Sequence, residues 1–455
     1  MRSRTAHERY LEFDGESSLI VVQDYREKYR AISDLLDANP KALALAHRDL
    51  TTLSSTNPKG RAGDFSSEQL LRALIVMCVE HTDYRDTVVR IANSDFLRHF
   101  VRLGYGQTAI DFTFLNRAHS AILESTWQSI NAVLSGYALS EKKIDGEKCR
   151  LDTTVVETNI HYPTDSSLLW DSFRTLARLV GNLQREYAEF ELDHRFHTRK
   201  VKKLAYFIAR NAKSPSPKTQ RKVKRTYRTL IERVTWIAQA AQAAVTQCSR
   251  VQVALVEIIA VLPLVKKVID QTERRVFNGE TVPAAQKIYS LFEPHTELLK
   301  RGKAGKPVEF GHKVLLAQTA EKFIHHYEVL PHRQEDQDLL APTLQAHKKT
   351  FGADPKVLAT DKGFYRSMEQ IRELEATIST VSMCKKGRRT AGEIVRESTE
   401  AFKEGQRFRA GCEGSISVLK RAFKLGKCLL KGFKHYAASI GLAVFCHNLV
   451  LLTRL

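Results

Sequence analysis

Two aspartates in this sequence stand where a carboxylate could carry chemistry, and the first lies where a charge is costly unless it binds a cation or a charged partner. Asp152 lies within LDTTVVE, a segment rich in β-branched residues that is predicted to form a strand. Asp361 follows the apolar run KVLAT and precedes a Lys-Gly pair, so it should project from the carboxyl end of a strand, where active-site groups gather in open sheets. Either aspartate alone could instead cap a helix, form a turn or belong to a buried ion pair.

A third acid, Glu413, lies in RFRAGCEGSISVLKRAF, whose apolar residues recur every three or four positions, the pattern of a helix with one buried side. On that helix Arg409, Glu413 and Lys420 fall within roughly 40° of one another. A solvated ion pair between Arg409 and Glu413 is one interpretation. Glu413 is also the last acidic residue of the chain, and basic residues follow it unopposed. A single carboxylate surrounded by this much positive charge is typical of a metal ligand beside a bound phosphate.

The composition points to a polyanionic partner. The 455 residues include 71 Lys and Arg against 51 Asp and Glu, a formal charge of +20, which favours nucleic acid over an acidic small molecule. The polar N-terminus predicts no signal peptide and a cytoplasmic protein without a membrane partner. The apolar stretch 435–452 is predicted to be a buried terminal helix.

Cysteine and histidine spacing gives no sign of a metal site. The 7 cysteines stand singly, without the pairs of a zinc site or a redox motif, and are expected to be reduced and mostly buried. The histidines that we take as packing or phosphate-side groups are His161, His312, His325, His326 and His332.

A dense basic segment spans residues 195–228, which hold thirteen Lys or Arg and no Asp or Glu. We expect it to bind phosphates, although a basic arm that only keeps the protein soluble is an alternative. The candidate DNA-contacting residues are Arg199, Lys200, Lys202, Lys203, Arg221, Lys222, Lys224, Arg225 and Lys424.

These residues need elements to position them, and the pattern predicts a mixed sheet split by helices. Helical periodicity begins at a capping box, Ser66 with Gln69, and continues after caps at Ser94 and Asp111. Strand-like segments are KCRLDTTVVETNIHY, KPVEFGHKVLLAQT with KFIHHYEVL as a hairpin, PKVLATDKGFY and EATISTVS. Between the first two, a helix capped by Asp165 or Ser166 opens a helical region that continues to about residue 300, with a break at residues 214–217.

The blocks LDTTVVE, VLATDKGFY and RAGCEGSISVLKRAF together resemble the DDE transposases of bacterial insertion sequences, which share the RNase H-like catalytic fold. The resemblance implies four segments: an N-terminal all-helical DNA-binding domain (1–140), a first part of the RNase H-like core (141–165), a long helical insertion (166–300) and the rest of the core with C-terminal helices (301–455). The chain departs from the signature at Gln406, where a tyrosine is usual.

The resemblance also implies roles for the residues. Asp152, Asp361 and Glu413 match the catalytic and metal-binding acids, which hold two Mg²⁺ or Mn²⁺ ions, with Asp152 bridging both. Arg409 and Lys420 match residues that grip flanking phosphates. Trp170 is a candidate for stacking on an extruded base, and a core position is its alternative.

The implied function is cleavage of phosphodiester bonds at insertion-sequence ends and transfer of the 3′-OH ends to target DNA. The partners would be double-stranded DNA, both inverted repeats and target, and a second copy of the chain in the synaptic complex. An RNase H-like nuclease that cuts without joining, a domesticated DNA-binding protein without activity and an RNA-binding protein remain open.

Overall fold

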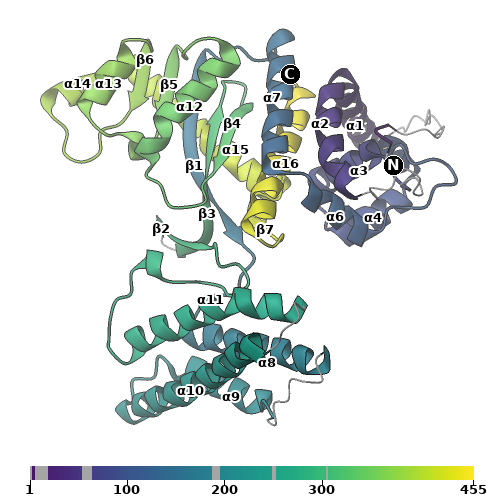
Figure 1. Ribbon diagram of the computed structural model, residues 1–455. Coiled ribbons are helices and arrows are strands. Elements are labelled where there is room, and N and C mark those ends of the chain that lie inside the picture. Colours follow the sequence, from purple (N-terminus) through teal and green to yellow (C-terminus); the bar gives the residue numbers. More distant parts are fainter. Residues whose placement is uncertain (1–2, 6–18, 54–63, 187–194, 248–252, 304–305) are drawn as a thin grey trace. The chain divides into compact units, whose positions relative to one another are not determined.

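The computed structural model describes residues 3–5, 19–53, 64–186, 195–247, 253–303 and 306–455 (Figure 1). It divides into two compact units: unit 1 is Met1–Glu157 with His312–Leu455, and unit 2 is Thr158–Gly311. Unit 1 therefore joins segments from both ends of the chain, with unit 2 between them in the sequence. The division into four segments, which the sequence analysis gives as domains, remains a prediction.

A mixed sheet of seven strands runs through the fold. The strands are β1 (Lys148–Thr158), β2 (Glu297–Lys303), β3 (Lys306–Gln318), β4 (Ile324–Val329), β5 (Val357–Thr360), β6 (Thr380–Met383) and β7 (Lys427–Cys428). Their order is β2-β3-β1-β5-β6, with β4 also paired to β3 and β7 to β1. The pairs β1–β5 and β5–β6 are parallel, while β3 pairs antiparallel with β2 and β4. The predicted hairpin is thus confirmed as β3 and β4.

Helices cover both faces of this sheet, because side chains on a strand alternate between faces. Leu315 and Ala317 of β3 pack in one apolar cluster, and Val314 and Leu316 pack in another. The first cluster includes residues of α12 (Asp336–Phe351) and α13 (Met368–Glu375), and we call that side the first face. The second face packs against α7 (Glu124–Ser140), α15 (Glu400–Ala422) and α16 (Phe433–Leu452). This mixed α/β architecture agrees with the predicted fold class and is consistent with an RNase H-like core.

The N-terminal helices of unit 1 begin at the predicted caps. The side chains of Ser66, Ser94 and Asp111 each accept a backbone N–H bond at a helix start, and Ser66 with Gln69 forms the full capping box. These helices share an apolar core with α16. The helices are α1 (Ile20–Ala38), α2 (Pro40–Leu50), α3 (Ser67–Val79), α4 (Tyr84–Ala92), α5 (Asp95–Val101) and α6 (Phe112–Ala121), and a short 3₁₀ turn, η1 (Thr51–Leu53), follows α2.

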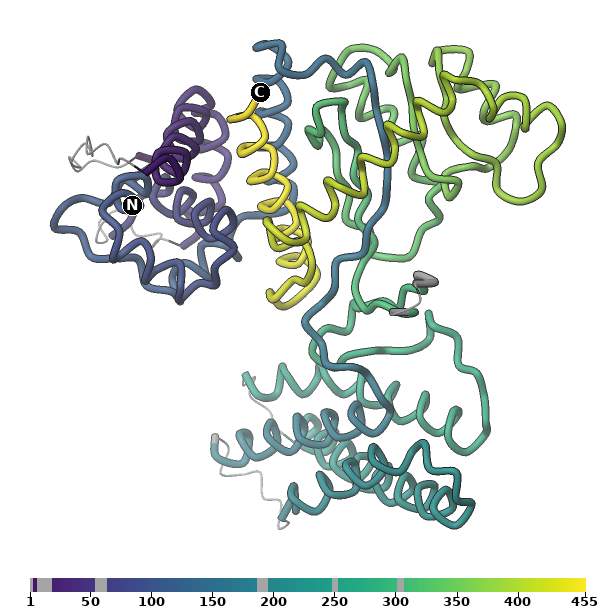
Figure 2. The backbone as a smooth tube through the Cα atoms, turned by 180° about the vertical axis from the view of Figure 1, so that it is seen from behind, coloured from purple at the N-terminus to yellow at the C-terminus, as the bar shows by residue number. Residues whose placement is uncertain are grey.

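Helix α16 is the buried terminal helix that the sequence predicts, and it lies beside α7 in both views (Figures 1 and 2). By length and composition it could also cross a membrane, but 83% of its most apolar window is buried inside the fold. A buried hydrogen-bond network around Asn448 links α16 to α7 and β4. Asn448 accepts from the N–H of Ile324 at 3.0 Å, and it donates to the Ile324 carbonyl at 2.8 Å and to Asn131 at 2.6 Å.

Among the described residues of unit 2, four α-helices surround their own apolar core. They are α8 (Asp165–Glu186), α9 (Thr198–Asn211), α10 (Pro217–Gln247) and α11 (Val253–Val276). The predicted break lies between α9 and α10, where Pro217 begins the second helix. The predicted cap of α8 was one or two residues too late, because the Thr164 hydroxyl accepts the N–H of Ser167 at 3.1 Å.

Two other segments differ from the sequence prediction. A helical region was expected to reach about residue 300, but its last α-helix, α11, ends at Val276, and β2 begins at Glu297 and pairs with β3. The segment EATISTVS was expected to be a strand throughout, but its first residue ends α13 and only Thr380–Met383 is extended. The remaining elements are η2 (Ala284–Gln286), η3 (Lys362–Phe364) and α14 (Ala391–Ser398).

Replacing Asn448 with alanine should destabilise unit 1 by about 2–4 kcal/mol, because the buried N–H of Ile324 and the side chain of Asn131 lose partners. Urea unfolding with intrinsic fluorescence would measure the change. The exposed Asn116, also in a helix of unit 1, is the matched control, and Asn116→Ala should cost less than about 0.5 kcal/mol. Equal changes in the free energy of unfolding for the two variants would contradict a structural role for the Asn448 hydrogen-bond network.

Candidate active site

Asp152 and Asp361 follow a registered pair in two neighbouring parallel strands. Leu151 of β1 is paired with Thr360 of β5, so each aspartate is the next residue along its chain. Neighbouring strands lie about 4.8 Å apart, which puts the two acids side by side. Each carboxylate accepts the backbone N–H of the residue after it, at 2.8 Å for Asp152 and 2.6 Å for Asp361.

Glu413 reaches the same place from α15. Cys149 and Leu151 of β1 pack on the first face, so alternation turns Asp152 to the second face, which α15 covers. Arg409 of α15 bridges the two acids: its guanidinium lies 3.2 Å from Asp152 Oδ2 and 3.6 Å from Glu413 Oε1. The structure therefore brings together the three acids predicted from the sequence.

The electrostatics of this cluster favour a divalent cation. Burial raises the pKa of Asp152, the Arg409 guanidinium lowers it, and the Asp361 and Glu413 carboxylates raise it. When ionised, these four groups carry three negative charges and one positive charge, a net −2. The Asp152 side chain is 13% exposed and that of Glu413 is 70% exposed, so the cluster opens to solvent on the Glu413 side. Carboxylate oxygens are the ligands that Mg²⁺ and Mn²⁺ prefer, so these residues fit such an ion.

Arg150, which the sequence analysis did not single out, holds α15 against β1. It lies two residues before Asp152 and therefore on the same face. Its guanidinium donates to the Phe408 carbonyl at 3.0 Å and to the Gln318 amide oxygen at 3.1 Å. A Cβ on Gly411 would overlap its Nη1 atom, so a larger residue there would displace the guanidinium from this position. A charged residue inside an apolar strand segment, with glycines in the facing helix, was the available signal.

Two more residues of α15 make contacts that stabilise the same interface. Lys420, predicted to grip a phosphate, donates from Nζ to the Val155 carbonyl of β1 at 2.8 Å. Gln406, which stands where a tyrosine is usual, donates to the Ser382 carbonyl of β6 at 2.7 Å. Phosphate contacts by Arg409 and Lys420 stay predictions.

In unit 2, the basic segment forms an exposed surface on α9 and α10. All thirteen Lys and Arg side chains from Arg195 to Arg228 are exposed. Within the described part of the chain, none of them forms an ion pair with an acid. Lys202 lies over Tyr206 at 5.5 Å and Lys222 over Phe207 at 5.0 Å. This surface therefore offers uncompensated positive charge.

Trp170 lies beside this surface and also packs on the core of unit 2. It lines a pocket of about 280 Å³ together with Lys202 and Tyr206, whose ring is 57% exposed. Asp171 in the same wall is paired with Arg174 at 2.8 Å. Core packing and an accessible aromatic edge are therefore both present at Trp170, and stacking on a base stays a prediction.

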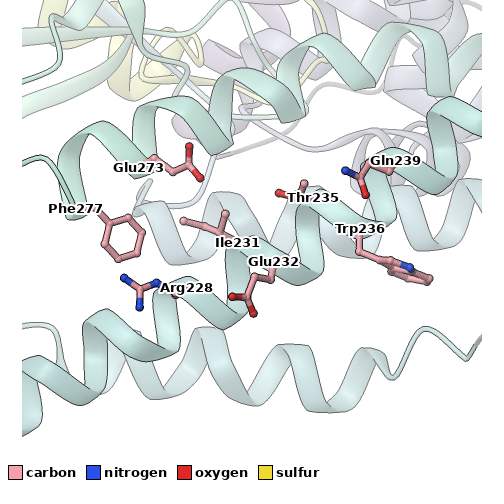
Figure 3. Close-up of a pocket in the computed structure, with 8 residues that line it drawn as sticks. All are labelled: Arg228, Ile231, Glu232, Thr235, Trp236, Gln239, Glu273 and Phe277. Carbon is pink, nitrogen blue, oxygen red and sulfur yellow. The ribbon is translucent and has the colours of Figure 1, made fainter.

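A second pocket of about 420 Å³ opens between α10 and α11 (Figure 3). Arg228, the last residue of the basic segment, lies over the Phe277 ring at 5.5 Å. Glu232 and Glu273 also line this pocket. Two carboxylates make it a poor site for phosphate, so the basic surface of α9 and the first half of α10 is the stronger candidate.

Lys424 in unit 1 differs from the other predicted DNA contacts. Its ammonium donates to the Thr82 carbonyl, and burial lowers its pKa. Lys424 is therefore engaged within unit 1, and a DNA contact by this residue stays a prediction.

A family model matches the part of the chain from the end of α11 through most of α16, which includes β2 to β7. Residues 268–449 match the family model of the transposase DDE domain. This chain carries a transposase DDE domain. The predicted family, DDE transposases of the insertion-sequence type, is thereby confirmed. Asp361 and Glu413 lie within the matched residues of the transposase, and Asp152 precedes them. No curated protein and no solved structure matches the chain.

Removing the positive charge of Arg409 should shift the pH dependence of metal binding by the transposase. Because this guanidinium lowers the pKa of Asp152, Arg409→Gln should leave Asp152 protonated up to a higher pH. The pH at which Mn²⁺ binding is lost should rise by about one unit, while binding well above that pH should tighten as the net charge falls from −2 to −3. Calorimetric titration with Mn²⁺ at a series of pH values would measure both effects.

The control is Arg407→Gln, on the same helix, whose exposed guanidinium pairs with Glu400. This variant should keep the wild-type pH profile. An unchanged profile in Arg409→Gln as well would show that Arg409 does not control the charge of Asp152.

Proposed function

We propose that this transposase cleaves phosphodiester bonds at the ends of its insertion sequence and transfers the freed 3′-OH ends to target DNA. The observation that carries the proposal is the meeting of Asp152 and Asp361 through strand register with Glu413 across Arg409. Hydrolysis and strand transfer are both in-line displacements at phosphorus, so one set of carboxylates serves both.

Each charged group has a role in this proposal. Two Mg²⁺ or Mn²⁺ ions held by the carboxylates would stabilise the attacking and leaving oxygens. Asp152, on which the charges of both other acids act, would be shared by both ions, while Asp361 and Glu413 would each hold one. Arg409 would exchange its carboxylate partners for a flanking phosphate once the acids are neutralised. The side chains position and neutralise charge, and none of them needs to act as a nucleophile.

DNA binding would be divided between several parts of the chain. The N-terminal helices 1–140 would recognise the terminal inverted repeats, and the basic surface on α9 and α10 would contact phosphates. Trp170 would stack on an extruded base. Two DNA ends must be held together for transfer, so a homodimer is proposed for the synaptic complex, acting on DNA in the cytoplasm.

Two other functions remain as competing proposals. A nuclease on the same fold would cut and not join. A domesticated DNA-binding protein would bind the element end and do neither. Retention of all three acids in one cluster favours an active enzyme over the second of these.

Substitution of each acid should abolish reaction while DNA binding survives. The substrate is a labelled DNA fragment bearing the element's end, incubated with a supercoiled target and either Mg²⁺ or EDTA. Asp152→Asn, Asp361→Asn and Glu413→Gln should each lower cleavage by about 10³-fold or more, because several kcal/mol of transition-state charge stabilisation are lost. Glu404→Gln, an exposed change on the same helix, should retain activity.

Thermal unfolding provides the folding control. Burial raises the pKa of Asp152, so ionising this group costs folding free energy, and that cost is fully present above the raised pKa. Asp152→Asn should therefore be at least as stable as wild type at neutral pH without metal. Binding of the element end without any cutting by the folded wild-type protein would favour the domesticated protein, and cutting without joining would favour the nuclease.

The basic surface should contribute to affinity through counterion release. For the variant Lys203→Gln/Lys224→Gln, the plot of log K against log salt should be shallower by about 0.9 for each lysine that contacts a phosphate. Fluorescence anisotropy at several salt concentrations measures this slope. The matched control, Lys348→Gln/Lys349→Gln on α12, removes two exposed lysines outside the surface. Identical slopes for the two double variants would exclude the surface from DNA binding.

A further inference from the structure

Three buried side chains form a compact cluster on the first face of the sheet. Cys149 is on β1, His325 on β4 and His347 on α12, and their exposed fractions are 0%, 6% and 0%. His325 Nε2 lies 3.3 Å from His347 Nδ1 and 3.6 Å from Cys149 Sγ. One potential ligand atom of each residue lies within 4.8 Å of the other two. All three residues belong to unit 1.

Hydrogen bonding alone does not satisfy this cluster. An imidazole nitrogen either donates one N–H bond or accepts one through its lone pair. His325 Nε2 faces two neighbours, so only one of the two contacts can be a well-directed hydrogen bond. Such an arrangement is unusual in a core and calls for a group that all three residues can contact.

Two of the three spacings between ligand atoms match those around one tetrahedral cation, and the third, between Cys149 and His347, is within 4.8 Å. With Zn–N bonds of about 2.0–2.1 Å and a Zn–S bond of about 2.3 Å, tetrahedral angles place two nitrogens about 3.4 Å apart and a nitrogen and a sulfur about 3.6 Å apart. The corresponding observed distances are 3.3 Å and 3.6 Å. A thiolate with two imidazoles is also a donor set that zinc prefers and that magnesium does not.

We propose that Cys149, His325 and His347 bind one Zn²⁺ ion, with a water molecule in the fourth position, as a structural site separate from the three carboxylates. Cys149 lies three residues before Asp152 on β1, and the two side chains point to opposite faces of the sheet. The cluster would tie β1 to β4 and α12 behind the carboxylates without touching DNA.

The protonation states of the cluster suit this ion. Burial lowers the pKa of His325 well below its usual value and that of His347 to about 4, so both imidazoles keep a lone pair at neutral pH. Burial raises the pKa of the Cys149 thiol, so formation of the Zn–S bond would release its proton. The Asp354 carboxylate raises the pKa of His347, against the effect of burial, and would supply negative charge near the bound cation.

The surroundings would retain a bound ion. The Phe351 ring lies 5.3 Å from the His325 ring and 4.6 Å from the His347 ring. Gly146 has a positive φ of 73°, and a Cβ there would overlap the Phe351 ring at 2.4 Å. This enclosure predicts slow exchange, because ligands closed off from water release their metal through local unfolding.

Metal analysis of the untagged full-length protein tests the proposal. Wild type should contain about one zinc per chain after dialysis, and zinc X-ray absorption should show one sulfur at about 2.3 Å and nitrogens at about 2.0 Å. Cys149→Ser and His347→Gln should lower zinc content at least tenfold. Cys428→Ser and His447→Gln, buried residues outside the cluster, should leave it unchanged.

The zinc X-ray absorption spectrum of the wild-type protein identifies the ligands directly, so the test does not depend on whether a variant folds. A zinc site with only oxygen neighbours would place the ion on the carboxylates and overturn the proposal, and so would zinc content that falls in Asp361→Asn. Wild-type protein that neither carries zinc nor takes it up on refolding with Zn²⁺ would overturn it as well. A sulfur and nitrogen environment around copper instead of zinc would refute the choice of metal.

Discussion

The parallel register of β1 and β5 fixes both the core of unit 1 and its acidic cluster. Leu151 stands opposite Thr360, and the next residue of each strand is an aspartate. Since side chains alternate, a slip of one residue would turn Asp152 to the first face and its apolar neighbours toward α15. The two carboxylates repel each other and gain nothing from this register without a cation. The apolar side chains of β1 and β5 buried on the first face hold the register that brings the acids together.

Helix α15 completes the acidic cluster because it can approach the sheet closely. A Cβ at Gly405 would lie 2.4 Å from the Ser382 side chain, and one at Gly411 would overlap Arg150. The Arg150 guanidinium then adds a directed hydrogen bond to the Phe408 carbonyl in the backbone of α15. Directed bonds fix the rotation of the helix about its axis as well as its distance, and that rotation decides whether Glu413 meets Asp152. Small residues on α15 are therefore a condition for the acidic cluster.

Local context was enough to predict some of these features from the sequence. Asp152 was predicted to lie within an apolar strand and Asp361 at the end of a strand. Both predictions depend only on residues a few positions away in the sequence. Contacts between distant segments were not accessible: Arg150 and Phe408 are 258 residues apart, and Cys149 and His325 are 176 apart. Spacing rules for zinc sites assume ligands close in sequence, so the cysteine and histidines seemed unrelated. Strand β2, with the sequence ELLKRGK, consists of helix formers apart from Gly302 and is extended because β3 pairs with it.

Strand β1 presents the Asp152 carboxylate on one face of the sheet and the Cys149 thiol, beside His325 of β4 and His347 of α12, on the other. The two faces differ in exposure, and this difference would decide which metal binds to each. Zinc binds most nitrogen, oxygen or sulfur sites more tightly than manganese, so donor type alone would not keep zinc away from the carboxylates. Mg²⁺ retains several waters when bound, and the 70% exposed Glu413 leaves room for them. The Cys149 cluster is closed to solvent, which favours an ion that exchanges all but one of its waters for thiolate and imidazole ligands. In the proposed arrangement, one strand therefore separates a retained structural ion from exchangeable catalytic ones through the exposure of its two faces.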